Sequence, residues 1–239
     1  LLQLNEFSNP EKVHNERYPF YTSSSLNMKN HFGNFAHWLK EKYLDNGSKL
    51  IEVGSNDGTL LENFKNMNIE AIGYEPSKTI AELANKKNIK TLNKFFNSQN
   101  IQDINHFHSS VDVICSANVI AHIPDLRDVI KSVDKLLSSK GLLIFEEPYL
   151  GSMFSKVSYD QIYDEHIFMF SISSINKIFD LFDFELIDVL PQVTHGGSMR
   201  YVIGRKNKHK KSDMISKLID DEQNKGLDTI ESCLKFKKA

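Results

Sequence analysis

The stretch from residue 49 to residue 58, Lys-Leu-Ile-Glu-Val-Gly-Ser-Asn-Asp-Gly, constrains the fold of this chain more than any other. Residues 50–53 are mostly apolar and rich in β-branched side chains, which is typical of a buried strand. Gly54 and Gly58 follow at once, and a helical pattern begins at Thr59. A strand, a glycine turn and a helix in that order predict a site where the backbone can approach a ligand closely.

An acidic residue follows this turn at a sequence distance that indicates a role in ligand binding. The next strand, residues 70–74, ends at Glu75, about 20 residues after the glycines, which is the spacing of a carboxylate that binds ribose hydroxyls. The alternative is an ordinary βα turn followed by a surface glutamate. Because Asn56 and Asp57 occupy the middle of the turn, a pyrophosphate is disfavoured there. Asp57 and the turn amides suit a ligand with an amino-acid end, since they can meet an ammonium and a carboxylate.

Strand and helix patterns alternate along the rest of the chain. Seven strands with helices between the first five predict an α/β fold with a doubly wound, seven-stranded, mainly parallel, Rossmann-like sheet. The further strands are expected at residues 90–92, 111–118, 142–148, 184–189 and 199–204, and the helices at residues 26–43, 77–87, 124–137, 173–182 and from 212 onward. The last helix has sparse apolar positions, so we expect it to need a partner outside this sequence.

Composition excludes several classes of function. The 239 residues carry a net charge of −2, which gives no long-range attraction to nucleic acid or to an anionic membrane. No apolar run is long enough to span a bilayer. Only Cys115 and Cys233 are present, so we expect no disulfide framework and a cytoplasmic location. No four Cys or His residues have zinc-ligand spacing, and we expect no metal; His106 and His108 read as a surface pair.

Three regions are expected along the chain. Residues 1–45 form an N-terminal arm and helix, residues 46–206 a ligand-binding domain with an aromatic insertion near 149–172, and residues 207–239 the start of a further domain. The sequence begins at Leu1 and stops within a helical pattern, so we expect it to be a piece of a longer protein. The basic run 205–211 is interpreted as a solvated loop in preference to a phosphate site.

Polar residues follow several expected strands, and in an open parallel sheet ligands bind beyond the carboxyl ends of strands. Asn118, Val119 and His122 follow the fourth strand, and Phe96 and Asn97 follow the third. His122 is either a structural part of its turn or a group that contacts substrate. The sequence therefore predicts one rim that carries both ligand and catalytic groups.

Two further segments carry chemistry-bearing residues. In the aromatic insertion, Tyr163, Glu165 and His166 are able to form an acid–base group. The alternative is a buried aromatic strand with one satisfied histidine. Residues 194–200, Thr-His-Gly-Gly-Ser-Met-Arg, form either a ligand-binding loop in which Arg200 meets a phosphate or a glycine-rich hairpin.

These motifs resemble a known family. Residues 52–58 and 73–77 resemble the first two motifs of class I S-adenosyl-L-methionine (SAM) methyltransferases. Residues 163–166 with Phe170-Ser171, residues 195–200, 21–25 and 117–122 are similar to the sugar C-methyltransferases that act on nucleotide-linked keto-deoxysugars.

The resemblance implies SAM as cofactor and a small nucleotide-sugar as substrate. Together with the positions after the expected strands, it assigns the cofactor to Gly54, Ser55, Asn56, Asp57, Gly58, Glu75, Asn118 and Val119, and the adenine of the cofactor to Phe96 and Asn97. It assigns catalysis to His166, Tyr163, Glu165, His122 and one of Tyr18 and Tyr21, and substrate binding to His195, Gly196, Gly197, Ser198 and Arg200.

The sequence also departs from that family. No part of it matches the cysteine-rich zinc domain or the final α/β domain of the family, and Asp164 stands where the loop motif usually has histidine. These departures bear on nucleotide affinity more than on the chemistry. Two alternatives stay open: an O- or N-methyltransferase of another small molecule, and a SAM-binding domain without turnover. Carbon methylation differs from both, because it requires a base that removes a proton beside a ketone.

Overall fold

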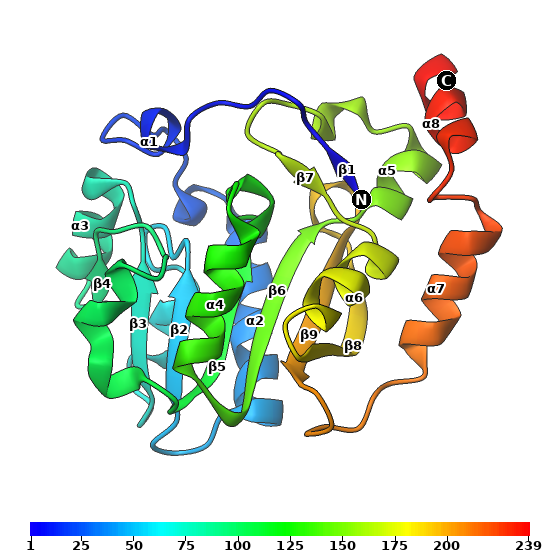
Figure 1. The fold of residues 1–239 in the computed structure, drawn as a ribbon. Helices are drawn as coiled ribbons and strands as arrows, with labels where there is room; N and C mark the ends of the chain where they lie inside the picture. Colours follow the sequence, from blue (N-terminus) through cyan, green and yellow to red (C-terminus); the bar gives the residue numbers. More distant parts are fainter. The chain divides into compact units, whose positions relative to one another are not determined.

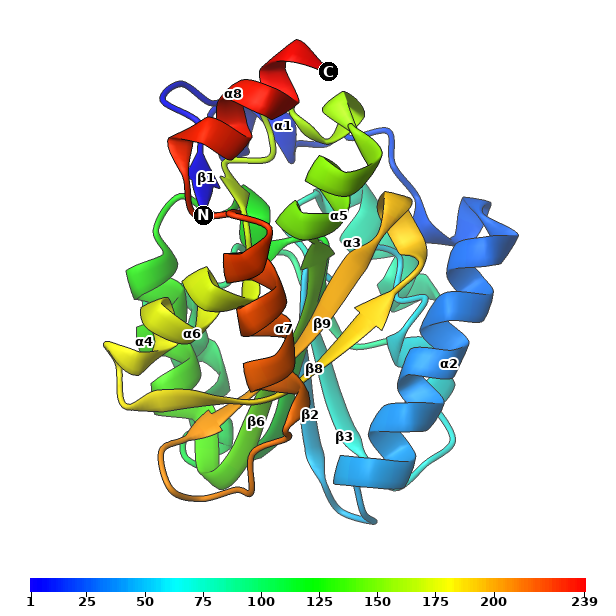
Figure 2. The same cartoon turned by 90° about the vertical axis from the view of Figure 1, so that its right-hand side faces the viewer.

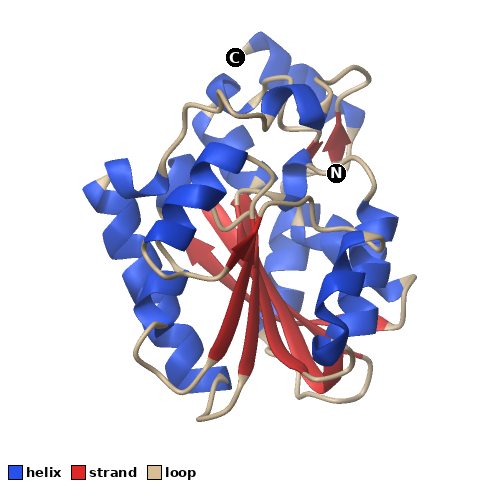
Figure 3. Cartoon of the chain, turned by 90° about the vertical axis from the view of Figure 1, so that its left-hand side faces the viewer, coloured by secondary structure: helices blue, strands red, loops and turns tan.

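The computed structural model describes residues 1–239. Seven strands form one sheet in the order β4-β3-β2-β5-β6-β9-β8, with helices on both sides (Figure 3). The pairs β2–β3, β2–β5 and β3–β4 are parallel, whereas β8–β9 is antiparallel. The predicted doubly wound, mainly parallel sheet is therefore confirmed. The strands are β2 (Lys49–Val53), β3 (Glu70–Tyr74), β4 (Thr91–Leu92), β5 (Val111–Ala117), β6 (Leu137–Pro148), β8 (Phe184–Gln192) and β9 (Ser198–Arg205).

The chain divides into two compact units. One, here called the turn unit, comprises residues 9–116 and 125–143; the other, the insertion unit, comprises residues 1–8, 117–124 and 144–239. No helix of the chain is both long and apolar enough to cross a membrane. No group of three or more His, Cys, Asp or Glu side chains is placed to hold a metal ion.

The turn unit builds its core from strands and capped helices. Its helices are α1 (Pro10–Val13), α2 (Leu26–Tyr43), α3 (Lys78–Lys86) and α4 (Leu126–Leu136). Helix α2 begins where Ser25 accepts from the Met28 N–H, and it buries Phe32, Phe35 and Leu39. It covers the opposite side of the strands from α4 (Figure 2).

The helix expected after the glycine turn is much shorter than its pattern indicates. Only the 3-10 helix Leu61–Phe64 forms there. The reason is local, because the Asn63 side chain donates to the Thr59 and Leu60 carbonyls, both at 3.0 Å. A side chain that occupies these acceptors competes with the backbone bonds of an α-helix.

The insertion unit is organised around the β8–β9 hairpin, whose register runs from Phe184 opposite Arg205 to Gln192 opposite Ser198. The hairpin interpretation of residues 194–200 is therefore confirmed. The unit also contains α5 (Leu150–Lys156), α6 (Ile172–Asp180) and an antiparallel pair of β1 (Leu2–Gln3) with β7 (Phe168–Met169).

The C-terminal residues differ from the single helix expected. They form α7 (Met214–Asn224) and α8 (Ile230–Lys238), separated by a turn in which Gly226 has a φ of 63°. Helix α7 packs against α6 and β8. Figure 1 shows α7 in orange and α8 in red. Phe236 of α8 stacks between Phe154 and Tyr159, with ring centroids 4.7 and 4.4 Å away. Both helices thus pack within the chain, and a further partner for them stays a prediction.

Candidate active site

The turn after β2 is built around three residues in the left-handed region of backbone space. Gly54, Asn56 and Gly58 have φ angles of 71°, 49° and 78°. Glycine adopts such angles without strain, and asparagine is among the few other residues that tolerate them. The N–H groups of Gly54 and Ser55 both donate to the Tyr74 carbonyl, at 2.8 and 3.0 Å. The turn is therefore tied directly to the end of β3.

Glu75 lies at the end of β3 beside this turn. Its two carboxylate oxygens accept from the backbone N–H groups of Asn56 and Ser77, at 3.0 and 2.8 Å. The residue is only 4% exposed, so the alternative of a surface glutamate is wrong. Burial raises the pKa of Glu75 to about 7, although the two backbone hydrogen bonds oppose the shift. Each carboxylate oxygen keeps a further lone pair, so the group can still accept from ligand hydroxyls.

Asp57 is already engaged within the protein. Its carboxylate accepts from the Thr59 hydroxyl at 2.7 Å, and Lys87 Nζ lies 3.4 Å away. Burial acts to raise its pKa, but hydrogen bonds from Ser23 and Thr59 and the charge of Lys87 outweigh burial and lower the pKa overall. The predicted contact between Asp57 and a ligand ammonium is not supported, because Lys87 already balances this carboxylate.

Glu52, on β2, is the acid that the sequence-based assignment missed. It is 4% exposed, and its Oε2 has no hydrogen-bond partner, which is also true of Ser55 Oγ. Burial raises the pKa of Glu52 well above its ordinary value, and the charges of Glu75 and Asp57 raise it further. An unpaired buried acceptor favours a ligand that brings a donor. A ligand that carries an ammonium or hydroxyl groups would supply such donors. The signal was present, since Glu52 lies two residues before Gly54 in the strand that leads into the glycine turn.

Phe96 and Asn97 follow β4 in the same unit. Phe96 is buried and meets Tyr74 edge to face, with ring centroids 5.3 Å apart. Asn97 Oδ1 accepts from the Asn100 N–H at 2.8 Å, so this side chain caps a local turn. An adenine contact for either residue stays a prediction.

Four side chains assigned to catalysis lie together in the insertion unit. The ring centroids of His122 and His166 are 4.9 Å apart, and those of Tyr163 and His166 are 4.1 Å apart. Glu165 Oε2 lies 3.9 Å from His122 Nδ1. His122 comes from the 3-10 turn after β5, whereas the other three come from the loop before β7. Tertiary structure therefore gathers two sequence motifs into one cluster.

The hydrogen bonds of His166 define its protonation. Its Nδ1 lies 2.9 Å from the Gln161 carbonyl, which can only accept, so Nδ1 carries the hydrogen. Its Nε2 lies 2.8 Å from the Tyr163 hydroxyl, which donates to it in the neutral imidazole. Burial lowers the pKa of His166, and the charge of His195 lowers it further, while the Gln161 carbonyl opposes the shift. These contacts and the lowered pKa favour a neutral imidazole whose Nε2 lone pair accepts the Tyr163 hydrogen bond.

Glu147 holds the turn that presents His122. It is fully buried at the end of β6, and its Oε1 accepts from the N–H groups of Val119 and Ala121, at 2.9 and 3.2 Å. Burial raises the pKa of Glu147 to about 8, against these backbone hydrogen bonds. Its neighbour Glu146 accepts at its backbone carbonyl from the Asn118 N–H, at 2.8 Å. The cofactor contacts expected for Asn118 and Val119 stay predictions.

The glycine-rich loop between β8 and β9 is fixed to α5. Lys156 Nζ donates to the Gly196 carbonyl at 2.5 Å. A Cβ at Gly197 would lie 2.5 Å from Ser152 Oγ, so this glycine serves close packing. A Cβ at Gly196 would lie 3.8 Å from Ser158 Oγ, an ordinary contact, and His195 has a φ of 51°. His195 and Gly196 are exposed, and their contact with a substrate stays a prediction.

Arg200 takes a different role from the one expected. It is 5% exposed, and its Nε and a terminal nitrogen donate to Glu146 Oε1 at 2.7 and 2.5 Å. A guanidinium buried against a carboxylate does not present itself to a substrate phosphate, so that prediction is corrected. Ser198 is also buried, and its hydroxyl donates to the Thr194 carbonyl at 3.1 Å.

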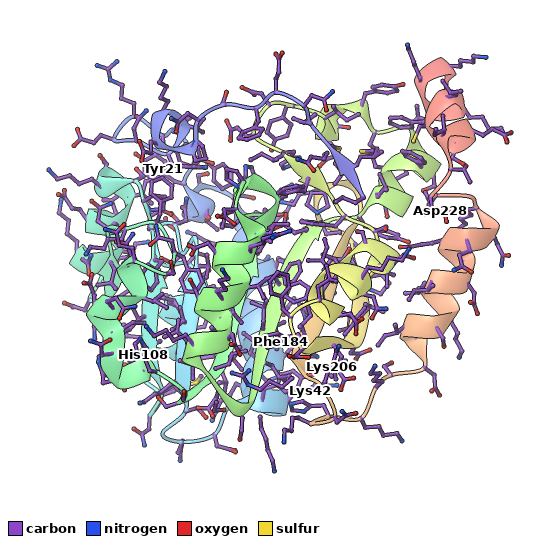
Figure 4. The ribbon with its side chains drawn as sticks, viewed as in Figure 1. Tyr21, Lys42, His108, Phe184, Lys206 and Asp228 are labelled. Atoms are coloured by element: carbon purple, nitrogen blue, oxygen red, sulfur yellow. The ribbon has the colours of Figure 1, made fainter.

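The two candidate tyrosines of the N-terminal region belong to the turn unit. They lie on residues 9–25, here called the arm. The Tyr18 ring packs against His14, with centroids 4.9 Å apart. Tyr21 precedes the 3-10 helix Thr22–Ser24 and is labelled in Figure 4.

The basic run 205–211 is paired with acids. Lys206 Nζ lies 2.7 Å from Asp180, and Lys211 Nζ lies 2.8 Å from Glu185 (Lys206 is labelled in Figure 4). These ion pairs support the interpretation of a solvated surface segment.

Comparison with known proteins places these features in a family context. Residues 30–189 match the model of a methyltransferase domain, and residues 193–239 match a C-methyltransferase C-terminal domain. The chain is 25% identical over 185 residues to the C-methyltransferase NovU of Streptomyces niveus, which covers 77% of this chain and 44% of NovU. The chain thus spans less than half the length of that curated relative.

Two solved structures share the fold. A possible histamine N-methyltransferase from Thermotoga maritima has a TM-score of 0.58 and 18% identity, covering 80% of this chain and 97% of its own. The magnesium protoporphyrin IX methyltransferase of Synechocystis, solved with bound SAH, has a TM-score of 0.55 and 14% identity, covering 74% and 83%. At these sequence identities, the similarity shows only that the fold is shared.

Proposed function

The chain belongs to the methyltransferase-domain family, and from this premise we propose that it methylates a carbon atom of a nucleotide-linked keto-deoxysugar. SAM is the cofactor, as the family and the fold indicate. Carbon as the methyl acceptor is supported by the match of residues 193–239 to a C-methyltransferase domain and by the similarity to NovU. The sugar is supported by the family resemblance of residues 163–171 and 195–200.

The turn unit supplies the cofactor contacts in this proposal. Glu75 accepts hydrogen bonds from the ribose hydroxyls, because its carboxylate is buried with lone pairs to spare. Glu52 meets the methionine ammonium through its unpaired Oε2. The turn of residues 54–58, in which Gly54, Asn56 and Gly58 have positive φ angles, lies at the methionine end of the cofactor in this proposal.

The cluster in the insertion unit supplies the acid–base chemistry. Bound SAM provides an electrophilic methyl group. A sugar carbon becomes a nucleophile only when the C–H bond beside a ketone breaks and leaves its electrons in an enolate. His166 Nε2 takes that proton, and His122 and Tyr163 donate hydrogen bonds to the enolate oxygen. Glu165, whose Oε2 lies 3.9 Å from His122 Nδ1, acts on that imidazole through its charge.

The observation that carries the proposal is the state of His166. The Gln161 carbonyl fixes the hydrogen on Nδ1, and burial keeps the ring neutral, so Nε2 is ready to accept a proton. The Tyr163 hydroxyl covers Nε2, and this tyrosine is 42% exposed. In this proposal the Tyr163 hydroxyl leaves Nε2 and turns to the substrate oxygen before the proton is taken.

The first prediction concerns His166→Asn. We expect turnover to fall by roughly 10²–10⁴-fold, the range for a lost acid–base group, while SAM affinity by calorimetry stays near wild type. Exchange of the substrate α-proton with deuterated water should fall in parallel. His37→Asn is the matched control, since that side chain is 73% exposed on α2. Full turnover in the His166 variant would move the base to another residue of the cluster.

Identification of the methylated product separates the proposal from its alternatives. A new carbon–methyl bond in the NMR spectrum of the product is expected for a keto-sugar. A methyl group on oxygen or nitrogen, or a substrate with no ketone, contradicts the enolate mechanism. SAM binding without any product from a panel of keto-sugars would leave a binding domain as the better description.

A further inference from the structure

Asn56 makes contacts that the glycine turn itself does not require. Its side-chain Oδ1 accepts from the Thr22 N–H at 2.9 Å, and its Nδ2 donates to the Phe20 carbonyl at 3.1 Å. Both partners lie on the arm, and Tyr21 is the residue between them. The side chain is largely buried, with 9% of the residue exposed. Both of these hydrogen bonds therefore hold the backbone on either side of Tyr21.

The backbone of Asn56 serves the cofactor site at the same time. Its N–H donates to Glu75 Oε2 at 3.0 Å, and its φ of 49° places it at the centre of the turn. A glycine at this position could also donate its N–H to Glu75 and adopt the positive φ, because neither feature involves a side chain. The carboxamide is thus needed only for the arm.

Other hydrogen bonds fasten the arm along the same edge. Ser77 Oγ donates to the Asn15 carbonyl at 2.9 Å, and Thr79 Oγ1 donates to the Glu16 carbonyl at 3.1 Å. Ser77 is also the residue whose N–H binds Glu75 Oε1. Both backbone partners of the ribose-binding carboxylate therefore hold the arm through their side chains.

We propose that Asn56 is a positioning residue whose carboxamide clamps residues 20–22 of the arm against the cofactor turn and so fixes Tyr21. Ligand contacts that steady Glu75 also steady the backbone of Asn56 and Ser77, and through their side chains the arm. SAM therefore reduces the motion of the arm. The effect on turnover rests on the proposed function of Tyr21, whereas the clamp itself does not.

Asn56→Gly isolates the carboxamide, because glycine keeps the N–H and accepts the positive φ. Hydrogen exchange of the arm peptide 18–25 is the readout in the protein without SAM. We expect its exchange to be at least tenfold faster in the variant, since the Thr22 N–H loses its acceptor. SAM should slow this exchange in wild type and have little effect in the variant. Asn88→Gly is the matched control, an exposed asparagine with a φ of 58° and no arm contact.

SAM affinity and turnover complete the test. Calorimetry should give a SAM affinity for Asn56→Gly within about fivefold of wild type, the cost of added backbone freedom. Turnover should fall further than that if Tyr21 acts on the substrate. Unchanged turnover with faster arm exchange would contradict the role of Tyr21 and leave the clamp standing. Unchanged arm exchange in the variant without SAM would overturn the clamp, whatever its SAM affinity.

A second variant tests the same bond from the arm. Thr22→Pro removes the N–H that Asn56 accepts, and Tyr21 already has the extended φ and ψ of −121° and 116° that a following proline requires. We expect the same faster exchange of the arm, measured on its remaining amides. Exchange of the arm in the double variant should be little faster than in either single variant, because both substitutions break the hydrogen bond between Thr22 and Asn56. Fully additive effects would contradict the clamp.

Discussion

At the scale of single residues, Glu75 shows how one carboxylate can define both a turn and a ligand site. Its two oxygens hold the backbone of Asn56 and Ser77, so the acid shapes the turn before any ligand arrives. Burial of the group favours its neutral form and raises its pKa to about 7. A ligand that donates hydrogen bonds favours the ionised form instead, so binding and ionisation are coupled.

That coupling predicts how SAM affinity depends on pH. Ribose hydroxyls bind the ionised Glu75, so below pH 7 binding must first remove a proton, and affinity should fall by up to about tenfold per pH unit. Calorimetry at pH 6 in buffers of different ionisation enthalpy should show proton release on SAM binding. Affinity that does not change between pH 5.5 and 8 would contradict the coupling.

A substitution tests the same residue at constant pH. Glu75→Gln removes the charge and places an amide NH₂ against one of the two backbone N–H donors. SAM affinity should therefore weaken by roughly 1.5–3 kcal/mol, which is the usual contribution of a hydrogen bond to a charged group. Glu82→Gln, an exposed position on α3, is the control and should bind SAM as wild type does. Unchanged affinity in the Glu75 variant would remove this residue from the site.

At the scale of elements, α7 is joined to α6 by one buried acid. Glu222 is 3% exposed and accepts from the N–H groups of Ile172 and Ser173, at 2.6 and 2.9 Å. The Tyr149 hydroxyl also donates to it, at 2.9 Å. The first turn of α6 has unsatisfied N–H groups and a positive dipole end, and Glu222 meets both. This is why a helix with few apolar positions is nonetheless held within the unit.

We therefore expect Glu222→Ala to destabilise the insertion unit. The change leaves several buried donors unpaired, and the free energy of unfolding should fall by about 2–4 kcal/mol. Glu231→Ala is the matched control, because Glu231 forms an exposed ion pair with Lys235 on α8, and its stability should stay near that of wild type. Denaturant unfolding measures both. Equal stability of the two variants would show that α7 is held by its apolar contacts alone.

At the scale of the whole molecule, buried acids link folding stability to pH. Glu147 has a pKa of about 8 in the folded chain, against an ordinary value of 4.5, because burial disfavours its charge. Between these values the folded state binds more protons than the unfolded state. Stability therefore falls as pH rises through this window, and Glu75 acts in the same direction up to about pH 7.

The corresponding prediction is a thermal midpoint that falls from pH 5 to pH 8 in the absence of SAM. Glu147→Gln keeps an acceptor for the Val119 and Ala121 N–H groups but cannot ionise, so its midpoint should fall less steeply. One such group contributes up to about 1.4 kcal/mol per pH unit. Glu62→Gln, at an exposed position, should follow wild type. If the thermal midpoint of the Glu147 variant falls with pH as steeply as that of wild type, this acid does not govern the pH dependence.

The sequence by itself determined the features that depend on neighbours along the chain. The order of strand, glycine turn and acid at Glu75 was readable because each residue type meets a local demand of backbone angle or strand end. The bounds of α2, Leu26–Tyr43, match the helix expected from the sequence, and its cap at Ser25 is also a local interaction. The group of Tyr163, Glu165 and His166 was also visible, since its members are close in sequence.

Tertiary structure alone decided which partners the polar side chains take. Arg200 is neutralised by Glu146, and Asp57 by Lys87, residues far apart in the sequence. Asn56 reaches the arm 34 positions earlier. No pattern of neighbours signals such pairs, because a charge or amide has the same identity in the sequence whether it faces a ligand, water or a buried partner. The free energy of burial makes the choice, since it forces each polar group to find its partner in the folded chain.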